Sequence, residues 1–290
     1  MPDEPWTILK LLHWTTDYFN RHKVAEPRAS AEVLLAHLLS QDRLFLYLNY
    51  DRPMEAEELA AFRTLVKRRL SGEPNQYITG VQEFWSLPFR VNPNVLIPRP
   101  ETEVLLETVL EFLGSSHHEI RVLDLGTGSG AIAVSLAREL AVVSIVATDS
   151  SMAALKLAKD NAVHNQVDRK IDFVCADMFS AFCPVAEKFT VVATNPPYLS
   201  RAEFSKLSPE IRDYEPRHAL DGGSDGLAAI RPIIQEAAAV LSQAGALVME
   251  IGAGQAESAI TLVKDSRHYE SYQIIKDYSG LDRVLLAVKK

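Results

Sequence analysis

The sequence contains little cysteine: only Cys175 and Cys183 among 290 residues. Two cysteines are too few to stabilise a fold of this size through disulfide bonds, which excludes a disulfide-rich secreted scaffold. Each lies beside an apolar segment, so we expect two reduced and buried thiols. The sequence also lacks an apolar run of the roughly 18 residues that a membrane-spanning helix needs. Together these absences predict a cytoplasmic protein that makes no contact with a membrane.

The sequence has no excess of positive charge either. Its net charge is −8, and residues 1–85 carry 10 Lys and Arg against 12 Asp and Glu, a balance of −2 that leaves −6 for the rest. A surface that binds bare nucleic acid neutralises phosphates with Lys and Arg. Neither part of the chain is such a module, so we expect no bare nucleic acid as a partner.

Residues 1–81 have the apolar periodicity of helices and predict a small N-terminal helical bundle. The apolar positions of its first two helices are Ile8, Leu11, Leu12, Phe19, Ala31, Leu34, Leu35, Leu38 and Leu39. Over residues 82–99 the pattern changes to aromatic and β-branched residues broken by proline and asparagine, which predicts a linking β-hairpin. A helix is expected to follow over residues 101–113.

The rest of residues 100–290 alternates strand and helix. The strand-like runs are residues 121–125, 142–147, 171–174, 190–193, 246–251, 272–275 and 283–288. The helix-like runs between them include residues 131–140, 151–164 and 227–241. This alternation predicts βαβ units and a mainly parallel sheet, whose last two strands lie too close together for a crossover helix and are antiparallel. The fold class is therefore α/β, Rossmann-like, with a seven-stranded mixed sheet and helices on both faces.

A glycine turn joins the first of these strands to the helix after it. Its residues are Gly126, Thr127, Gly128, Ser129 and Gly130. A strand, a glycine turn and a helix N-terminus form a ligand cradle at the carboxyl end of a parallel sheet. Glycine suits this place because the backbone must turn sharply and approach a ligand without Cβ atoms.

Acidic residues follow the next two strands. Asp149 can accept hydrogen bonds from two vicinal ribose hydroxyls. Asp177 and the backbone amide of Met178 can read an adenine edge, although Asp177 alone is equally well explained as a helix-capping aspartate. These features at three successive strand ends predict a nucleoside site. A nicotinamide dehydrogenase is the rival interpretation, and it leaves the next motif without a purpose.

Asn195, Pro196, Pro197 and Tyr198 follow the fourth strand, beside the predicted cleft. The side-chain oxygen of Asn195 and the carbonyl of Pro196 can both accept hydrogen bonds from one NH₂ group. Two acceptors orient a planar nitrogen and favour the positive charge that builds up as it attacks a methyl carbon. Tyr198 offers a flat face for stacking. The motif alone does not choose between a nucleic-acid base and an amide.

The glycine turn, Asp149 and the Asp177-Met178 pair resemble the class I methyltransferase fold. The resemblance implies that the cofactor is S-adenosyl-L-methionine, with S-adenosyl-L-homocysteine as the product, and that no metal takes part. It places residues 126–130 around the methionine part, Asp149 on the ribose, Asp177 and Met178 beside adenine, and Asn195 next to the cofactor. Asn195, Pro196 and Tyr198 are then the expected catalytic residues, with Pro197 in the substrate site.

More specifically, the chain resembles the peptide chain release factor N5-glutamine methyltransferases, the HemK/PrmC family. The agreement covers residues 73–80, 83–85, 89–91, 96–103, 124–130, 195–198, 214–216, 219–220, 223–227, 250–252, 255 and 282–283. The run Ile-Pro-Arg-Pro-Glu-Thr-Glu at 97–103, joined to Asn-Pro-Pro-Tyr in this order, is the specific part of that signature. The chain departs from it at Trp85-Ser86, where the family commonly has glycine, and at Met178, where some relatives have an aromatic residue.

The resemblance implies that the substrate is the glutamine of the Gly-Gly-Gln loop in release factors 1 and 2. The helical domain would then bind the folded release factor. No oligomer is required. The alternatives are a glutamine methyltransferase for a ribosomal protein, an amino-methylating enzyme for DNA or RNA, and a binding module without catalysis. Glu101 and Glu103 either shape the cleft or complement the dipole of a helix start.

Overall fold

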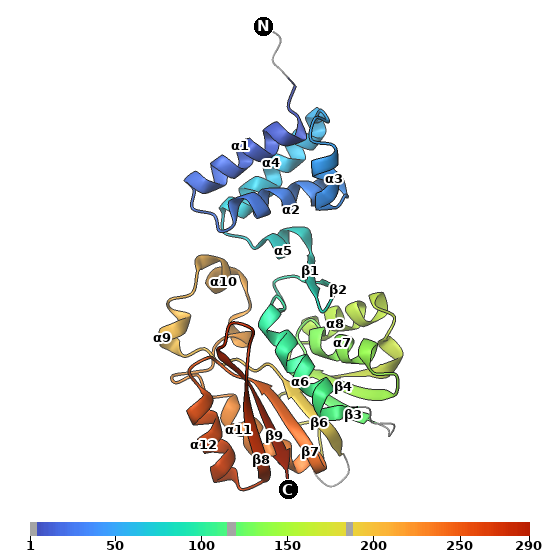
Figure 1. Cartoon of the computed structure of the whole chain (residues 1–290), viewed down its shortest axis with the longest axis vertical. Helices are drawn as coiled ribbons and strands as arrows, with labels where there is room; N and C mark the ends of the chain where they lie inside the picture. Colours follow the sequence, from blue (N-terminus) through green and yellow to red (C-terminus); the bar gives the residue numbers. More distant parts are fainter. Residues whose placement is uncertain (1–4, 115–119, 184–187) are drawn as a thin grey trace. The chain divides into compact units, whose positions relative to one another are not determined.

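The computed structural model describes residues 5–114, 120–183 and 188–290. The chain forms two compact units (Figure 1). The first, called the helical unit, comprises Met1–Gly80 together with Ser208–Tyr214, and the second, called the sheet unit, comprises Val81–Leu207 and Glu215–Lys290. Within the described residues, no helix is both long and apolar enough to cross a membrane.

The helical unit is built on amphipathic helices whose apolar stripes meet in one core. Its largest fully buried side chains include Phe19, Leu34, Leu35 and Phe62. Its helices are α1 (Ile8–Arg21), α2 (Pro27–Leu39), α3 (Arg43–Leu48), α4 (Ala56–Leu70), α5 (Asn75–Thr79) and α10 (Pro209–Tyr214). The sequence did not predict the short helices α3, α5 and α10, because five or six residues carry too little periodicity to be recognised.

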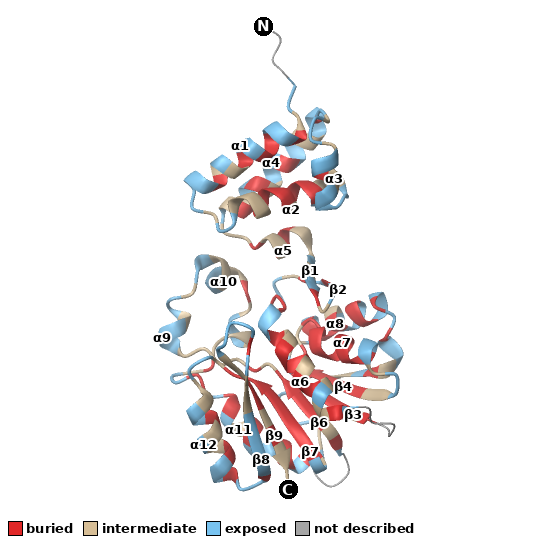
Figure 2. Ribbon diagram, in the orientation of Figure 1, coloured by how far each residue is buried: buried red, intermediate tan, exposed pale blue. Residues whose placement is uncertain are grey.

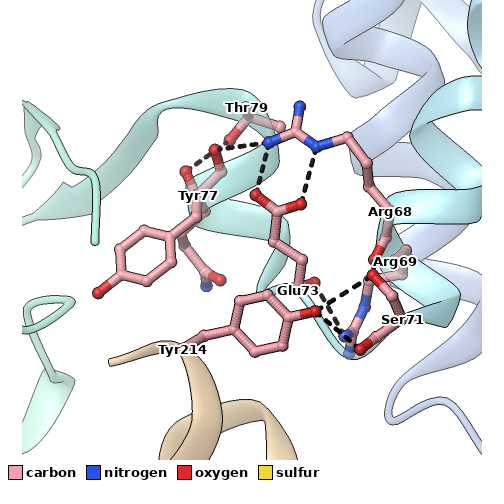
Figure 3. Close-up of polar contacts among 8 residues, drawn as sticks. Arg68, Arg69, Ser71, Glu73, Tyr77, Thr79 and Tyr214 are labelled. Atoms are coloured by element: carbon pink, nitrogen blue, oxygen red, sulfur yellow. Dashed lines mark hydrogen bonds and ion pairs between the residues drawn. The ribbon is translucent and has the colours of Figure 1, made fainter. Parts of the chain in front are cut away.

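Helix α10 joins the helical unit although it is more than a hundred residues away in the sequence. Arg69 of α4 is buried and forms an ion pair with Glu210 at 2.8 Å. The hydroxyl of Tyr214 donates to the carbonyl oxygen of Ser71 at 2.8 Å (Figure 3). Beside them, Arg68 binds both carboxylate oxygens of Glu73, at 2.5 and 2.7 Å. These contacts explain why the segment after the Asn-Pro-Pro-Tyr motif belongs to this unit.

The sheet unit contains a seven-stranded sheet with the strand order β5-β4-β3-β6-β7-β9-β8. Strands β5, β4, β3, β6 and β7 run parallel to one another, whereas β9 is antiparallel to both β7 and β8. The predicted seven-stranded mixed sheet with an antiparallel closing pair is confirmed. The strand bounds are β3 (Ile120–Leu125), β4 (Val143–Asp149), β5 (Ile171–Cys175), β6 (Phe189–Thr194), β7 (Leu241–Glu250), β8 (Tyr269–Lys276) and β9 (Asp282–Lys289).

Helices cover both faces of this sheet, and its central strands are buried (Figure 2). Val122 of β3 packs in the core of one face and Leu123 in the core of the other, as the period of two in a strand requires. The first core includes residues of α6 (Glu103–Leu113), α7 (Ala131–Glu139) and α8 (Met152–His164), and the second includes residues of α11 (Ile230–Val240) and α12 (Ala256–Ser266). The remaining short elements are α9 (Arg201–Phe204), η1 (Pro100–Thr102), η2 (Asp168–Lys170) and η3 (Arg217–Ala219).

The predicted hairpin is formed by β1 (Val81–Phe84) and β2 (Leu87–Arg90). Its inward residues Phe84 and Phe89 are buried in the core of the sheet unit. Two residues, Trp85 and Ser86, make the turn with φ of 52° and 56°. This is the twist that a two-residue hairpin loop needs, and glycine or asparagine adopts it at lower cost than tryptophan or serine.

The prediction that both cysteines are buried is wrong. Cys175 and Cys183 are free, as expected, but exposed. Cys175 is the last residue of β5, which lies at the edge of the sheet, and its thiol donates weakly to the carbonyl of Ser150 at 3.7 Å. Apolar neighbours in the sequence do not bury a residue on the outer side of an edge strand.

Candidate functional site

The loops that follow β3, β4 and β6 meet at one edge of the sheet. The registers place Leu125 beside Thr148 on one side and beside Thr194 on the other, so the three parallel strands end together. Such an edge is where open α/β sheets bind ligands. A pocket of about 340 Å³ lies there. Of the predicted site residues it is lined by Gly126, Thr127, Gly128, Ser129, Asp149, Asp177, Met178, Asn195, Pro196 and Pro197.

The three glycines of the turn have different roles. Gly126 and Gly128 have φ of +76° and +55°, and a Cβ added to either would meet no protein atom within 4 Å. Both therefore leave space for a ligand close to the backbone. Gly130 is not part of the pocket lining. A Cβ there would lie 3.1 Å from Cβ of Ala158, so Gly130 allows α7 and α8 to pack closely.

Asp149 organises the glycine turn as well as facing the pocket. One carboxylate oxygen accepts the backbone N–H of Gly128 at 3.0 Å, and the other accepts that of Ser151 at 2.8 Å. A carboxylate oxygen has two lone pairs, so each can still accept a ligand hydroxyl. The geometry therefore fits a vicinal diol, as expected for the ribose of a nucleoside.

Asp124 is a residue that the sequence-based site omitted. It is fully buried, and its Oδ2 accepts the hydroxyl of Thr127 at 2.6 Å and the N–H of Ala133 at 3.1 Å. Within the described residues its Oδ1 has no hydrogen-bond partner. Burial raises the pKa of Asp124 to about 7, against the opposing effect of its two hydrogen bonds. A charged residue inside an otherwise apolar strand was the feature of the sequence that could have identified it.

Asp177 and Met178 lie together in the pocket lining, after β5. Met178 has φ of +46°, an uncommon conformation for a residue with a side chain. Its side chain is partly buried and packs against the second core of the sheet unit. The packing of the Met178 side chain thus helps to place the backbone of this pair beside the pocket.

The Asn-Pro-Pro-Tyr motif is held by two further residues that the prediction missed, Thr102 and Glu250. Asn195 Nδ2 donates to Thr102 Oγ1 at 3.1 Å, and Thr102 Oγ1 donates to Glu250 Oε2 at 2.7 Å. The Tyr198 hydroxyl donates to Glu250 Oε1 at 3.1 Å. Tyr198 is not part of the pocket lining, and its ring packs against the second core. Its predicted role as a stacking face remains a prediction.

The loop that contains Gly222 and Gly226 clamps the backbone of the motif. Gln255 Nε2 donates to the carbonyls of Tyr198 and Gly226 at 2.9 and 3.1 Å. A Cβ on Gly226 would lie 2.4 Å from the Tyr198 carbonyl oxygen, which only glycine tolerates. The backbone of Leu199 also exchanges hydrogen bonds with Leu220 and Gly222, at 3.0 and 2.8 Å. This packing accounts for the glycines among residues 222–226.

The roles of Arg99 and the two glutamates near it are now visible. Arg99 lines the pocket and forms an ion pair with Glu215, whose side chain is 1% exposed and also accepts the N–H of Ile97 at 3.1 Å. Glu103 accepts the backbone N–H of Trp85 at 2.8 Å and so stabilises the hairpin turn. Glu101 is exposed. Neither glutamate is part of the pocket lining.

The pocket residues fit S-adenosylmethionine. The open space over Gly126 and Gly128 accommodates a ligand against backbone amides, and the carboxylate of Asp149 suits the ribose hydroxyls. The buried carboxyl of Asp124 supports the turn from beneath, through the hydroxyl of Thr127 and the N–H of Ala133. Asn195 and Pro196 line the same pocket.

Comparison with known proteins agrees with this arrangement. Residues 10–80 match the family model described as PrmC N-terminal domain. Residues 100–210 match the model described as Methyltransferase small domain. A methyltransferase domain thus covers the glycine turn, Asp149 and the Asn-Pro-Pro-Tyr motif.

Two relatives match this chain over nearly its whole length. The release factor glutamine methyltransferase of Geobacter sulfurreducens is 43% identical over 283 residues, which are 97% of this chain and 96% of that protein. That of Rhodopirellula baltica is 38% identical over 286 residues, 98% of this chain and 96% of that protein. Among solved structures, a SAM-dependent methyltransferase from Agrobacterium tumefaciens is 15% identical with a TM-score of 0.50, covering 72% of this chain and 69% of that one. This last likeness concerns the fold alone.

Proposed function

Because the chain belongs to the release factor glutamine methyltransferase family, we propose that it methylates the side-chain amide nitrogen of the glutamine in the Gly-Gly-Gln loop of release factors 1 and 2. The chain is an S-adenosylmethionine-dependent protein-glutamine methyltransferase of the class I fold. The observation that carries the proposal is the position of Asn195 and Pro196 in the lining of the pocket that also contains the glycine turn.

The residues of the glycine turn and Asp149 hold the cofactor in this proposal. When bound, S-adenosylmethionine supplies a methyl group on a positively charged sulfur and leaves as S-adenosylhomocysteine. Gly126 and Gly128 would admit its amino-acid part, Asp149 would accept the ribose hydroxyls, and Asp177 and Met178 would border the adenine. Loss of the carboxylate of Asp149 should therefore weaken cofactor binding.

Asn195 and Pro196 orient the glutamine amide. Two acceptors on one NH₂ group fix the plane of the amide, so that its nitrogen lone pair faces the methyl carbon. They also stabilise the positive charge that develops on nitrogen as the N–C bond forms and the C–S bond breaks. No strong general base is needed, because the proton leaves after the transfer. The prolines contribute by having no N–H to compete for these acceptors.

The helical unit is the proposed docking surface for the release factor. Leu44, Tyr47 and Leu48 of α3 are exposed, and Leu48 is 71% exposed. They stand at the spacing i, i+3, i+4, which places them on one face of the helix. Exposed apolar and aromatic side chains of this kind mark protein-binding surfaces. Changing Leu44 and Leu48 to glutamate should raise KM for the release factor and leave kcat unchanged.

A ribosomal protein remains the second candidate substrate, because glutamine amides have the same chemistry in any protein. DNA or RNA amino groups are disfavoured by the net charge of −8. A cytoplasmic location and the absence of a membrane partner are predictions that accompany this proposal. They follow from composition and not from the site.

Transfer of labelled methyl groups tests the proposal. Release factor, a ribosomal-protein mixture, transfer RNA and duplex DNA are each incubated with the protein and labelled S-adenosylmethionine. The proposal predicts label in the release factor alone, and none after Gln→Ala in its Gly-Gly-Gln loop. Asn195→Ala should lose most of this transfer while calorimetry still detects cofactor binding. Equal turnover by Asn195→Ala would mean that the motif is only a turn.

A further inference from the structure

The side-chain amide of Asn195 is connected to a buried carboxylate through a single hydroxyl. Asn195 Nδ2 lies 3.1 Å from Thr102 Oγ1, which lies 2.7 Å from Glu250 Oε2. Glu250 is fully buried at the end of β7, and Thr102 is buried at the start of α6. The three residues come from separate elements of the sheet unit, so the connection depends on the fold and not on the motif.

The chemistry of these three groups allows one arrangement when Glu250 is charged. A carboxylate offers only acceptors, so the single hydroxyl proton of Thr102 must point at Glu250. The oxygen of Thr102 is then the acceptor for Asn195, which must present its NH₂ group to it. Within the described residues, Asn195 Oδ1 has no donor. Since Asn195 lines the pocket, this oxygen is left for a substrate.

The surroundings of Glu250 act in both directions on its charge. Burial raises the pKa of Glu250 above its usual value, and the charge of Glu101 adds to the rise, while the hydrogen bonds from Thr102 and Tyr198 and the charge of Arg283 offset only part of it. Arg283 is itself held by Asp277 at 3.0 Å. Two donated hydrogen bonds and a fixed cation therefore favour the charged carboxylate against the effect of burial.

We propose that Thr102 and Glu250 are positioning residues that fix the Asn195 amide with its oxygen toward the substrate. The reversed amide would present an NH₂ group to the NH₂ group of the substrate, two donors that cannot bond. The proposal rests on the proposed function in one respect, because it takes the substrate to be a planar NH₂ group. The orientation of Asn195 itself can be tested without a substrate.

Thr102 variants test the hydroxyl. Thr102→Val keeps the shape and removes the hydroxyl, whereas Thr102→Ser keeps the hydroxyl. Partners of this kind change activity by about 10–100-fold when lost. We expect Thr102→Val to lower kcat within that range, with little change in the cofactor Kd or in KM for the release factor, and Thr102→Ser to restore most of it. Thr108→Val is the matched control, because Thr108 is buried on the helix that follows Thr102 and, among the described residues, its hydroxyl bonds only the carbonyl of Val104.

Glu250→Gln tests the charge. A glutamine can donate to Thr102, which then donates to Asn195 Oδ1, so both amide orientations become available. We expect kcat to fall by about tenfold, with the cofactor Kd unchanged. If a thermal melt shows that Thr102→Val does not fold, Glu250→Gln and Thr102→Ser carry the test together. Wild-type kcat in Glu250→Gln, or in folded Thr102→Val, overturns the proposal, and so does a Thr102→Ser variant as slow as Thr102→Val.

A measurement on the cofactor-free protein separates this proposal from the proposed function. With selective ¹⁵N-asparagine labelling, and Asn195→Ala to assign the signal, the exchange of the Asn195 side-chain amide protons with solvent is followed by NMR. We expect slow exchange in the wild type and Thr102→Ser, and fast exchange in Thr102→Val. Equally fast exchange in the wild type contradicts the positioning role. If the exchange is slow but the wild type methylates no release factor, the proposed function fails and the positioning role stands.

Discussion

The Gln255 side-chain amide donates to the carbonyl oxygen of Tyr198 at 2.9 Å and so fixes the end of the Asn-Pro-Pro-Tyr motif. The same nitrogen bonds Gly226, and Gln255 Oε1 accepts the N–H of Gly252 at 2.9 Å. Gln255 is not part of the pocket lining. It therefore affects the motif through the backbone and not through a ligand.

We predict that Gln255→Ala lowers kcat/KM for methyl transfer by about tenfold, because two carbonyls lose their donor and the motif loosens. Gln255→Glu should be worse, since it places a carboxylate against the same two oxygens. Steady-state kinetics with calorimetry of cofactor binding distinguishes the two effects. Wild-type kinetics in both variants would show that the hydrogen bonds of Gln255 have no role in catalysis.

Gly128 and Gly130 should respond differently to the same substitution. Gly128→Ala projects a methyl group into open pocket space, so it should weaken cofactor binding with a loss of stability of only about 1 kcal/mol for the left-handed backbone. Gly130→Ala meets Ala158 at 3.1 Å and should lower the free energy of unfolding by more, typically about 1–3 kcal/mol beyond the backbone cost. Calorimetry and denaturant unfolding measure the two effects. If the two variants show the same losses, the distinct roles of these glycines are refuted.

The hairpin turn offers a stabilising substitution. Ser86 has φ of 56°, which costs a residue with a side chain about 1 kcal/mol relative to glycine. Ser86→Gly should therefore raise Tm by about 2 °C. Ser86→Ala is the control and should bring no gain, because alanine has the same backbone restriction. Thermal denaturation followed by circular dichroism measures the Tm of both variants. An equal rise in Tm for Ser86→Ala would count against the backbone explanation.

The raised pKa of Asp124 predicts a pH-dependent stability of the cofactor-free protein. Its pKa is about 7 in the folded protein against an ordinary value of 3.8, so the folded state binds this proton more tightly than the unfolded state does. The contribution of the protonated carboxyl is fully present below pH of about 4 and is lost as the pH rises through about 7. The stability of Asp124→Asn relative to the wild type should therefore increase across that window. Urea unfolding of both proteins at several pH values measures it, and a constant difference contradicts the assignment.

The sequence predicted those features that depend on neighbouring residues. The strand runs, the glycine turn and the acid after β4 are local patterns, and the structure places Gly128 and Asp149 in contact. The regular alternation of strand and helix was enough to predict a mixed sheet. The long helix α12 was missed, although its apolar positions Ala259 and Val263 are at helical spacing and buried.

The features that the sequence did not predict depend on distant contacts. Asn195 and Thr102 are 93 residues apart, and Arg99 and Glu215 are 116 residues apart. No local pattern pairs such residues, because the pairing is made by the order of the strands. The exposure of Cys175 likewise follows from the edge position of β5.

The most direct test of the central claim is to locate the methyl group. Purified release factor is treated with the protein and S-adenosylmethionine, and its peptides are then sequenced by tandem mass spectrometry. The account predicts one added methyl group, on the side-chain amide of the glutamine in the Gly-Gly-Gln loop, and none when Asn195→Ala replaces the wild type. A release factor without the methyl group, or with it on any other residue, would contradict the account.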